Sequence, residues 1–226
     1  MKPLPTVDLN WPKAWRIIST RFPAIELFEE VADPKDWEAL AELERLTNPR
    51  YLDEIGDLSL VPLHQRVSGE GASYVMSPFT HPRPGRFSTD AWGAFYAAST
   101  LDTAVAETVY HHELFYRDSG LDPLDVDVRV LTLRAQGTVH DLRNTKKLYR
   151  DALHLTDYLP SQRLAQIHRE LGSKGILYPS VRIQGGECLA AFTPTLISHC
   201  RHLRYLCYRW DGQRISDIFE KRPFVL

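Results

Sequence analysis

The sequence predicts a protein of mixed α and β structure, and three observations lead to that class. Phe95 to Ala98 is a short apolar run typical of a buried strand, and Leu101 to Val109 repeats apolar residues at helical spacing. Val126 to Val130 alternates valine with charged residues, which is typical of a half-buried strand. With 226 residues and 43% hydrophobic content, the chain has room for one domain with an extension rather than for two full domains.

Local signals set the order of the elements along the chain. Asp33-Pro34 favours the start of a helix. Ser99 and Asp102 form a variant of the capping box, so we expect a helix to begin near Leu101. Pro179 has no amide to donate and therefore interrupts a strand. The predicted helices are at 33–46, 101–109 and 160–171, and the predicted strands are at 95–98, 126–130 and 189–192. A further strand is expected within 172–182, interrupted at Pro179, and a hairpin over 203–215 turns at Asp211-Gly212.

Three polar residues near these boundaries are candidates for a functional site. Glu107 lies beside the apolar face of its helix, where a carboxylate can reach the cleft at the strand ends, although a solvated glutamate fits the pattern equally well. Arg86 precedes a strand, and its planar fork suits phosphate as well as an ordinary surface position. Ser180 follows the interrupted strand and either binds a ligand or satisfies a local turn.

Several segments of the chain together resemble the RES domain family, which is named for its Arg, Glu and Ser. The segments are GRFS, FYAAS, DTAVAETVYHHE, GILYPSVR and CLAAF, and the resemblance covers Arg66 to Phe192. It implies an α+β fold with a bent central sheet surrounded by helices, as in ADP-ribosyltransferases. It also divides the chain into an N-terminal extension, residues 1–60, with one helix packed on the core, and a RES catalytic domain, residues 61–226.

The resemblance assigns roles to individual residues. The catalytic set that it implies is Arg86, Glu107 and Ser180. Tyr96 corresponds to a tyrosine that lines the same pocket, and a tyrosine that belongs only to the core is the alternative. A further arginine is expected near the substrate phosphates: Arg66, in a loop with two glycines, ranks slightly ahead of Arg16.

The activity implied by the resemblance is that of a toxin that degrades NAD. Inorganic phosphate would be the acceptor, and the products would be nicotinamide and ADP-ribose 1″-phosphate. Breaking the nicotinamide–ribose bond develops oxocarbenium-like charge on the sugar, which a carboxylate such as Glu107 stabilises. The arginines would hold phosphate groups and Ser180 a ribose or nicotinamide group. NAD is then a consumed substrate, so no cofactor is expected.

The expected partners also follow from the resemblance. An Xre-type antitoxin protein would block the site, and self-association into a homo-oligomer is left open. Two other functions also stay open. A mono-ADP-ribosyltransferase that modifies a protein would share the cleavage step, whereas a noncatalytic nucleotide-binding or interaction protein would bind NAD without turnover.

Composition excludes several other classes of function. The net charge of −2 and the pI near 6.5 argue against direct nucleic-acid binding. A local basic group near the C-terminus is most simply a solvated strand face; its members are Arg201, Arg204, Arg209 and Arg214. No apolar run approaches the length of a membrane span, and the first ten residues lack a signal-peptide core. We therefore expect a cytoplasmic protein without a membrane partner.

Cysteines and histidines give no sign of a metal site. Cys188, Cys200 and Cys207 lack the spacing of a zinc site, which favours reduced core residues in a cytosol. His111 and His112 are adjacent, so on a helix they point about 100° apart and do not face one ion together.

Overall fold

The computed structural model describes residues 3–20, 35, 37, 56–145 and 149–222, and within them the chain forms a seven-stranded sheet with helices on its two sides. The strand order is β1-β2-β5-β4-β3-β6-β7, with a further pairing between β1 and β3. The strands are β1 Thr6–Ser19, β2 Phe95–Ala98, β3 Leu124–Asp141, β4 Gly175–Pro179, β5 Glu187–Ala191, β6 Ile197–Trp210 and β7 Ile215–Lys221.

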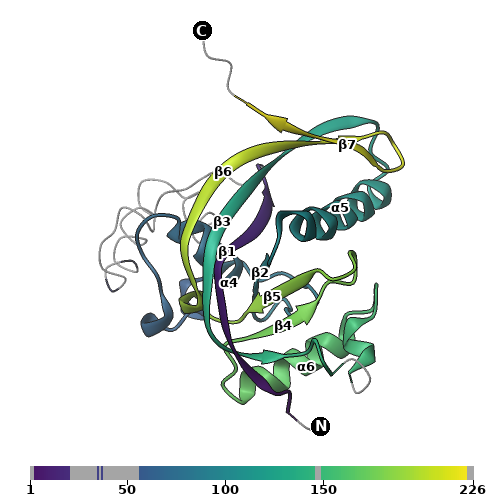
Figure 1. The fold of residues 1–226 in the computed structure, drawn as a ribbon. Helices are drawn as coiled ribbons and strands as arrows, with labels where there is room; N and C mark the ends of the chain where they lie inside the picture. Colours follow the sequence, from purple (N-terminus) through teal and green to yellow (C-terminus); the bar gives the residue numbers. More distant parts are fainter. Residues whose placement is uncertain (1–2, 21–34, 36, 38–55, 146–148, 223–226) are drawn as a thin grey trace.

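The sheet is bent and consists of two connected parts, one formed by β1, β3, β6 and β7 and one formed by shorter strands (Figure 1). The long strands β1, β3, β6 and β7 pair antiparallel, with β1 and β3 in register from Thr6–His140 to Ser19–Val128. The short strands β2, β5 and β4 form the second part. The two parts meet where β1 pairs with β2 at Trp15–Ala98 and where the end of β3 runs parallel to β4. The α+β fold with a bent central sheet is therefore confirmed.

The described helices cover different parts of this sheet. They are α4 Ala72–Thr80, α5 Leu101–Asp118 and α6 Leu159–Glu170. Figure 1 shows α4 and α5 on opposite sides of the β3–β6 layer and α6 beside β4. Short 3-10 turns complete the element list: η1 Leu58–Leu60, η2 Leu63–Gln65, η3 Arg150–Leu153 and η4 Pro194–Leu196.

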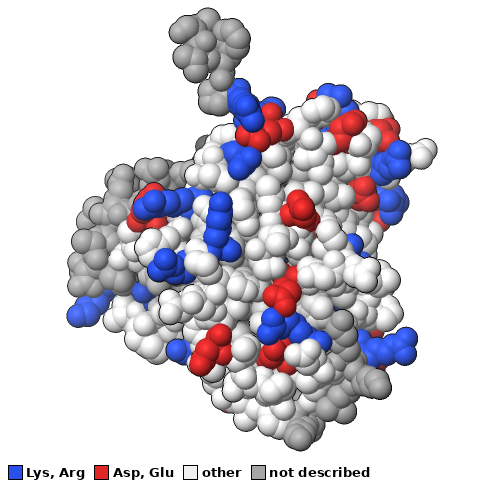
Figure 2. Space-filling view, in the orientation of Figure 1, with Lys and Arg blue, Asp and Glu red and all other residues white. Residues whose placement is uncertain are grey.

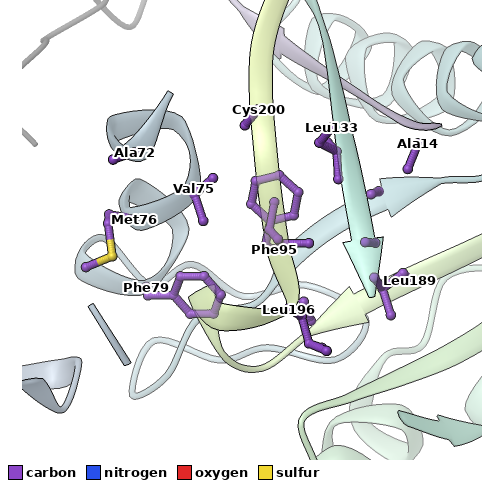
Figure 3. Packing of buried hydrophobic residues seen from close by; sticks show 14 of the residues in the cluster. Ala14, Ala72, Val75, Met76, Phe79, Phe95, Leu133, Leu189, Leu196 and Cys200 are labelled. Carbon is purple, nitrogen blue, oxygen red and sulfur yellow. The ribbon is translucent and has the colours of Figure 1, made fainter. Parts of the chain in front are cut away.

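One core cluster lies between α4 and the sheet. Figure 3 shows Met76 and Phe79 of α4 on the side of the sheet that carries Phe95 and Leu189. A second cluster lies on the other side of the short strands, because successive residues of a strand point to opposite faces. There Tyr96 and Tyr178 pack near α6. The short strands are thus buried on both faces, and the Tyr96 face is the one that carries the candidate site.

Most of the predicted elements are confirmed. The strand at Phe95–Ala98, the helix start at Leu101, the interruption at Pro179 and the C-terminal hairpin all occur. The predicted cap is wrong by one residue: Thr100, not Ser99, caps α5, and its hydroxyl accepts the Thr103 amide at 3.2 Å. With Thr100 at the N-cap, the third residue of the helix is Thr103 instead of Asp102, so the capped amide also shifts by one position.

The first sixty residues contain an unexpected strand. β1 lies within the expected extension, yet it pairs along the length of β3 in the central sheet. Trp37 also belongs to the core on the α4 side and is 2% exposed. The helix expected at 33–46 lies, apart from Lys35 and Trp37, outside the described residues. The division at residue 60 stays a prediction.

The C-terminal arginines are paired with carboxylates. The ion pairs are Arg201–Glu70, Arg204–Glu220, Arg209–Asp125 and Arg214–Asp211. On the face drawn in Figure 2, basic and acidic side chains are interspersed. Three of these arginines thus form a solvated face of β6, as expected, while Arg214 lies in the turn before β7. No helix of the described residues has the length and hydropathy needed to cross a membrane.

Candidate active site

Glu107 and Ser180 meet at the junction of α5 and the short strands. Glu107 lies in the second turn of α5, and Ser180 follows directly after β4 ends at Pro179. The Ser180 hydroxyl donates to Glu107 Oε1 at 2.6 Å, and it accepts from the amides of Arg182 and Ile183 at 3.1 and 3.3 Å. Because two amides occupy its lone pairs, the hydroxyl directs its proton at the carboxylate, and the short distance is typical of a charge-assisted bond.

Two buried side chains, Tyr178 and Cys188, lie next to the half-buried Glu107 carboxylate. Tyr178 and Cys188 face each other in the β4–β5 register, and the Cys188 Sγ atom lies 3.8 Å from Glu107 Oε1. Burial, with a further contribution from Glu107, raises the pKa of the Cys188 thiol, and burial raises the pKa of Tyr178 well above its usual value. Both groups are therefore neutral, and the thiol is a second, weaker donor to the same carboxylate oxygen.

Arg86 is buried on the same side of the sheet. It is 6% exposed, and its Nη1 donates to the carbonyl oxygens of Ala152 and His154 at 3.3 and 2.7 Å. Its guanidinium lies 4.7 Å from the centre of the Tyr158 ring. Its positive charge acts on Tyr96, Tyr178 and Cys188, which places the guanidinium among the groups around Glu107.

Tyr96 holds the segment that carries Arg86. Its hydroxyl accepts the Phe87 amide at 2.8 Å and lies 3.1 Å from the Ser88 hydroxyl. Burial raises the pKa of Tyr96 to about 12, so the phenol stays protonated. The two residues after Arg86 are thereby fixed to β2, and Tyr96 belongs to the site through this contact as well as through its ring.

The other two predicted arginines lie elsewhere. Arg66 donates from Nε to Val61 O and from Nη2 to Leu58 O, at 3.0 and 3.1 Å. Arg16 donates to Tyr96 O at 2.8 Å, but its guanidinium lies 4.5 Å from the Phe95 ring, on the opposite face of β2 from the Tyr96 side chain. Burial lowers the pKa of Arg16 to about 10. The structure thus brings Arg86, Tyr96, Glu107 and Ser180 to one side of the sheet. Arg66 donates to carbonyl oxygens of residues 58 and 61, and Arg16 reaches the Tyr96 carbonyl from the other face of β2.

Sequence reasoning missed two residues of this site, His111 and Arg182. His111 follows Glu107 by one turn of α5, and an i, i+4 spacing on one helix face was the signal for it. Burial lowers the pKa of His111, against the effect of Glu107 and with the help of Arg182 and Arg86, so all three charges lie near the imidazole. Arg182 stacks on Tyr110 with 3.3 Å between the guanidinium carbon and the ring centre. No sequence periodicity predicts the position of Arg182, because the residue lies in a loop.

No metal-binding arrangement accompanies these residues. Within the described part of the chain, no three His, Cys, Asp or Glu side chains gather as they would around a metal ion.

Comparison with known proteins identifies the class of this chain. The profile of the RES domain matches residues 64–211, so the chain belongs to the RES domain family. The uncharacterized protein y4oC of Sinorhizobium fredii is 27% identical over 223 residues, which cover 94% of this chain and 92% of that protein. A solved structure, the MbcT–MbcA toxin-antitoxin complex of M. tuberculosis, aligns with a TM-score of 0.48 and 13% identity over 92% of this chain and 87% of that one.

Proposed function

We propose that this RES protein cleaves the nicotinamide–ribose bond of NAD and transfers the ADP-ribosyl group to inorganic phosphate. The observation that carries the proposal is the Ser180–Glu107 hydrogen bond of 2.6 Å, which joins residues from two distant segments into one fixed carboxylate. The buried Arg86 guanidinium, whose charge acts on the same Cys188 thiol as Glu107 does, supports the same assignment. Membership in the RES domain family agrees with this set of residues.

The chemistry requires a carboxylate that is oriented before the substrate arrives. Among the described residues, the two hydrogen bonds to Glu107 both fall on Oε1, and we assign the second oxygen, Oε2, to the ribose. As the bond from the ribose C1 atom to the nicotinamide nitrogen breaks, its electron pair leaves with neutral nicotinamide. The sugar gains oxocarbenium-like charge, which the Glu107 carboxylate stabilises. A phosphate oxygen then attacks C1 and forms ADP-ribose 1″-phosphate.

The biological role that we propose is that of a toxin held inactive by an Xre-type antitoxin protein. The support for this role is the family itself. Production of the chain alone is expected to deplete cellular NAD and stop growth, and Glu107→Gln is expected to restore both.

The direct test is nicotinamide release from NAD by the purified protein, with and without inorganic phosphate. Glu107→Gln should lower the rate by about 100-fold or more, since it removes the main transition-state charge. Glu170→Gln, at an exposed glutamate of α6, is the matched control and should keep the rate.

Each outcome of this test leads to a different conclusion. Phosphate-stimulated release that depends on Glu107 supports the proposal. Release that phosphate does not change would point to hydrolysis or to a protein acceptor instead. No release under either condition would contradict the proposal and favour a noncatalytic nucleotide-binding protein.

A further inference from the structure

Both the backbone and the side chain of Arg182 contact residues at the candidate site. Its amide donates to the Ser180 hydroxyl at 3.1 Å, and its guanidinium stacks on Tyr110 at 3.3 Å. Tyr110 follows Glu107 by three positions on α5, so the two share a helix face. The Arg182 guanidinium therefore lies over the helix surface next to the Glu107 carboxylate.

The hydrogen-bonding capacity of Arg182 is only partly used. Its Nη2 donates to Leu155 O, whereas its Nε is buried and has no partner among the described residues. A buried N–H without an acceptor is unfavourable, and more so on a charged group. A guanidinium with unused donors is suited to an oxyanion, because its fork matches two oxygens at once.

Arg86 and Arg182 reach the same stretch of chain. Arg86 donates to the carbonyl oxygens of residues 152 and 154, and Arg182 to that of residue 155. Carbonyl oxygens carry partial negative charge, so here they stand in for the oxygens of an anionic ligand. The two guanidinium groups and the one carboxylate near His111 leave an excess of positive charge, which suits a ligand with more than one negative oxygen.

We propose that Arg182, together with Arg86, binds the pyrophosphate of the dinucleotide substrate. The identity of the ligand rests on the proposed function, whereas the anion preference rests on the contacts of Arg182 itself. Arg182 then takes the role expected for Arg66 or Arg16. The Arg66 guanidinium donates to carbonyl oxygens of residues 58 and 61, and the Arg16 guanidinium lies against Phe95 on the other face of β2. The carbonyl oxygens of residues 152–155 give way to the phosphate oxygens when the substrate binds.

The experiment is a titration with ADP-ribose, which carries the pyrophosphate but lacks nicotinamide. Calorimetry compares the wild type with Arg182→Gln, with Arg182→Lys and with Arg214→Gln, a matched control at an arginine that is 75% exposed. Arg182→Gln should weaken ADP-ribose binding about 10-fold or more, because a charge-assisted bond is lost. The affinity of Arg182→Lys for ADP-ribose should lie between those of the wild type and Arg182→Gln, since lysine keeps the charge but lacks the planar fork. Arg214→Gln should bind ADP-ribose as the wild type does.

Nicotinamide riboside, which has no phosphate, separates a binding role from a structural one. Its affinity should not change in Arg182→Gln. Where NAD cleavage is measured, KM for NAD should rise about 10-fold while kcat stays within about 3-fold, because Arg182 contacts a group remote from the broken bond.

Three results would overturn the inference. They are wild-type affinity for ADP-ribose in a folded Arg182→Gln variant, an equal loss of nicotinamide riboside binding, and no binding of ADP-ribose by the wild type. If ADP-ribose binds in an Arg182-dependent way but NAD is not cleaved, the inference holds and the proposed function fails.

Discussion

Removing the Ser180 hydroxyl tests whether the orientation of Glu107 drives the activity. In the Ser180→Ala variant, Glu107 Oε1 loses the donor at 2.6 Å and keeps only the Cys188 thiol at 3.8 Å. The carboxylate remains, but its rotation is no longer fixed by a strong bond. We therefore expect a loss of activity with the substrate still able to bind.

The expected magnitude follows from the type of bond. A hydrogen bond to a charged group contributes about 1.5–3 kcal/mol, which corresponds to a decrease of about 10- to 150-fold in kcat/KM. The amides of Arg182 and Ile183 also lose their acceptor, but their loop is partly exposed and water can replace the hydroxyl. The free energy of unfolding should thus fall by no more than about 1 kcal/mol.

The assay is steady-state nicotinamide release, combined with urea unfolding of each variant. Ser216→Ala is the matched control, because the exposed Ser216 hydroxyl also donates to a carboxylate, that of Asp217, at 2.9 Å. In a Glu107→Gln background, Ser180→Ala should add little, since both residues act through one carboxylate. Wild-type kcat/KM in a folded Ser180→Ala variant would refute the reasoning.

Three further changes give independent tests. Tyr96→Phe leaves the Phe87 amide without its acceptor and should cost about 1–3 kcal/mol in urea unfolding; equal stability would contradict the role of the Tyr96 hydroxyl. In the wild type the buried Leu4 amide donates to His168 Nε2 at 3.0 Å, so His168→Phe leaves this amide without its acceptor. The free energy of unfolding in urea should again fall by about 1–3 kcal/mol. Burial lowers the pKa of His111 from its usual value of 6.5, so near that pH the unfolded chain binds more protons at His111 than the folded chain does. The free energy of unfolding therefore decreases as the pH is lowered. His111→Gln should reduce this loss between pH values of about 7.5 and about 5.5, and an unchanged slope would refute it.

The sequence patterns located the elements whose signals are local. The run Phe95–Ala98 followed by helical spacing from Leu101 predicted β2 and α5, because both signals lie within a few residues. β1 was missed: Pro12 lies inside it, at an irregularity between Trp11 and Ala14, and a proline within a run argues against a strand. β1 is a strand because it pairs with β3, and its own residues do not show a strand pattern.

The site was predictable only where a residue type carries the chemistry. The family pattern named Glu107, Arg86 and Ser180 as site residues. In the structure Ser180 donates to Glu107, and Arg86 and Glu107 both act on the Cys188 thiol, whereas their catalytic roles stay a prediction. Cys188 reaches Glu107 through the β4–β5 register, which depends on how two strands align and not on either strand alone. Arg182 lies in a loop, where neither the helical nor the strand periodicity of a sequence predicts which way a side chain points.

The pairing of the first strand with β3 has a consequence for synthesis on the ribosome. β1 ends at Ser19, but its main partner is complete only at Asp141, so the strand waits for that segment. At about 5–20 residues per second, this wait is on the order of ten seconds, during which β1 presents unpaired backbone groups. Ser180 emerges later still. A nascent chain thus carries Arg86 and Glu107 for some time before Ser180 joins them, so the site that we propose to be catalytic is complete only late in translation.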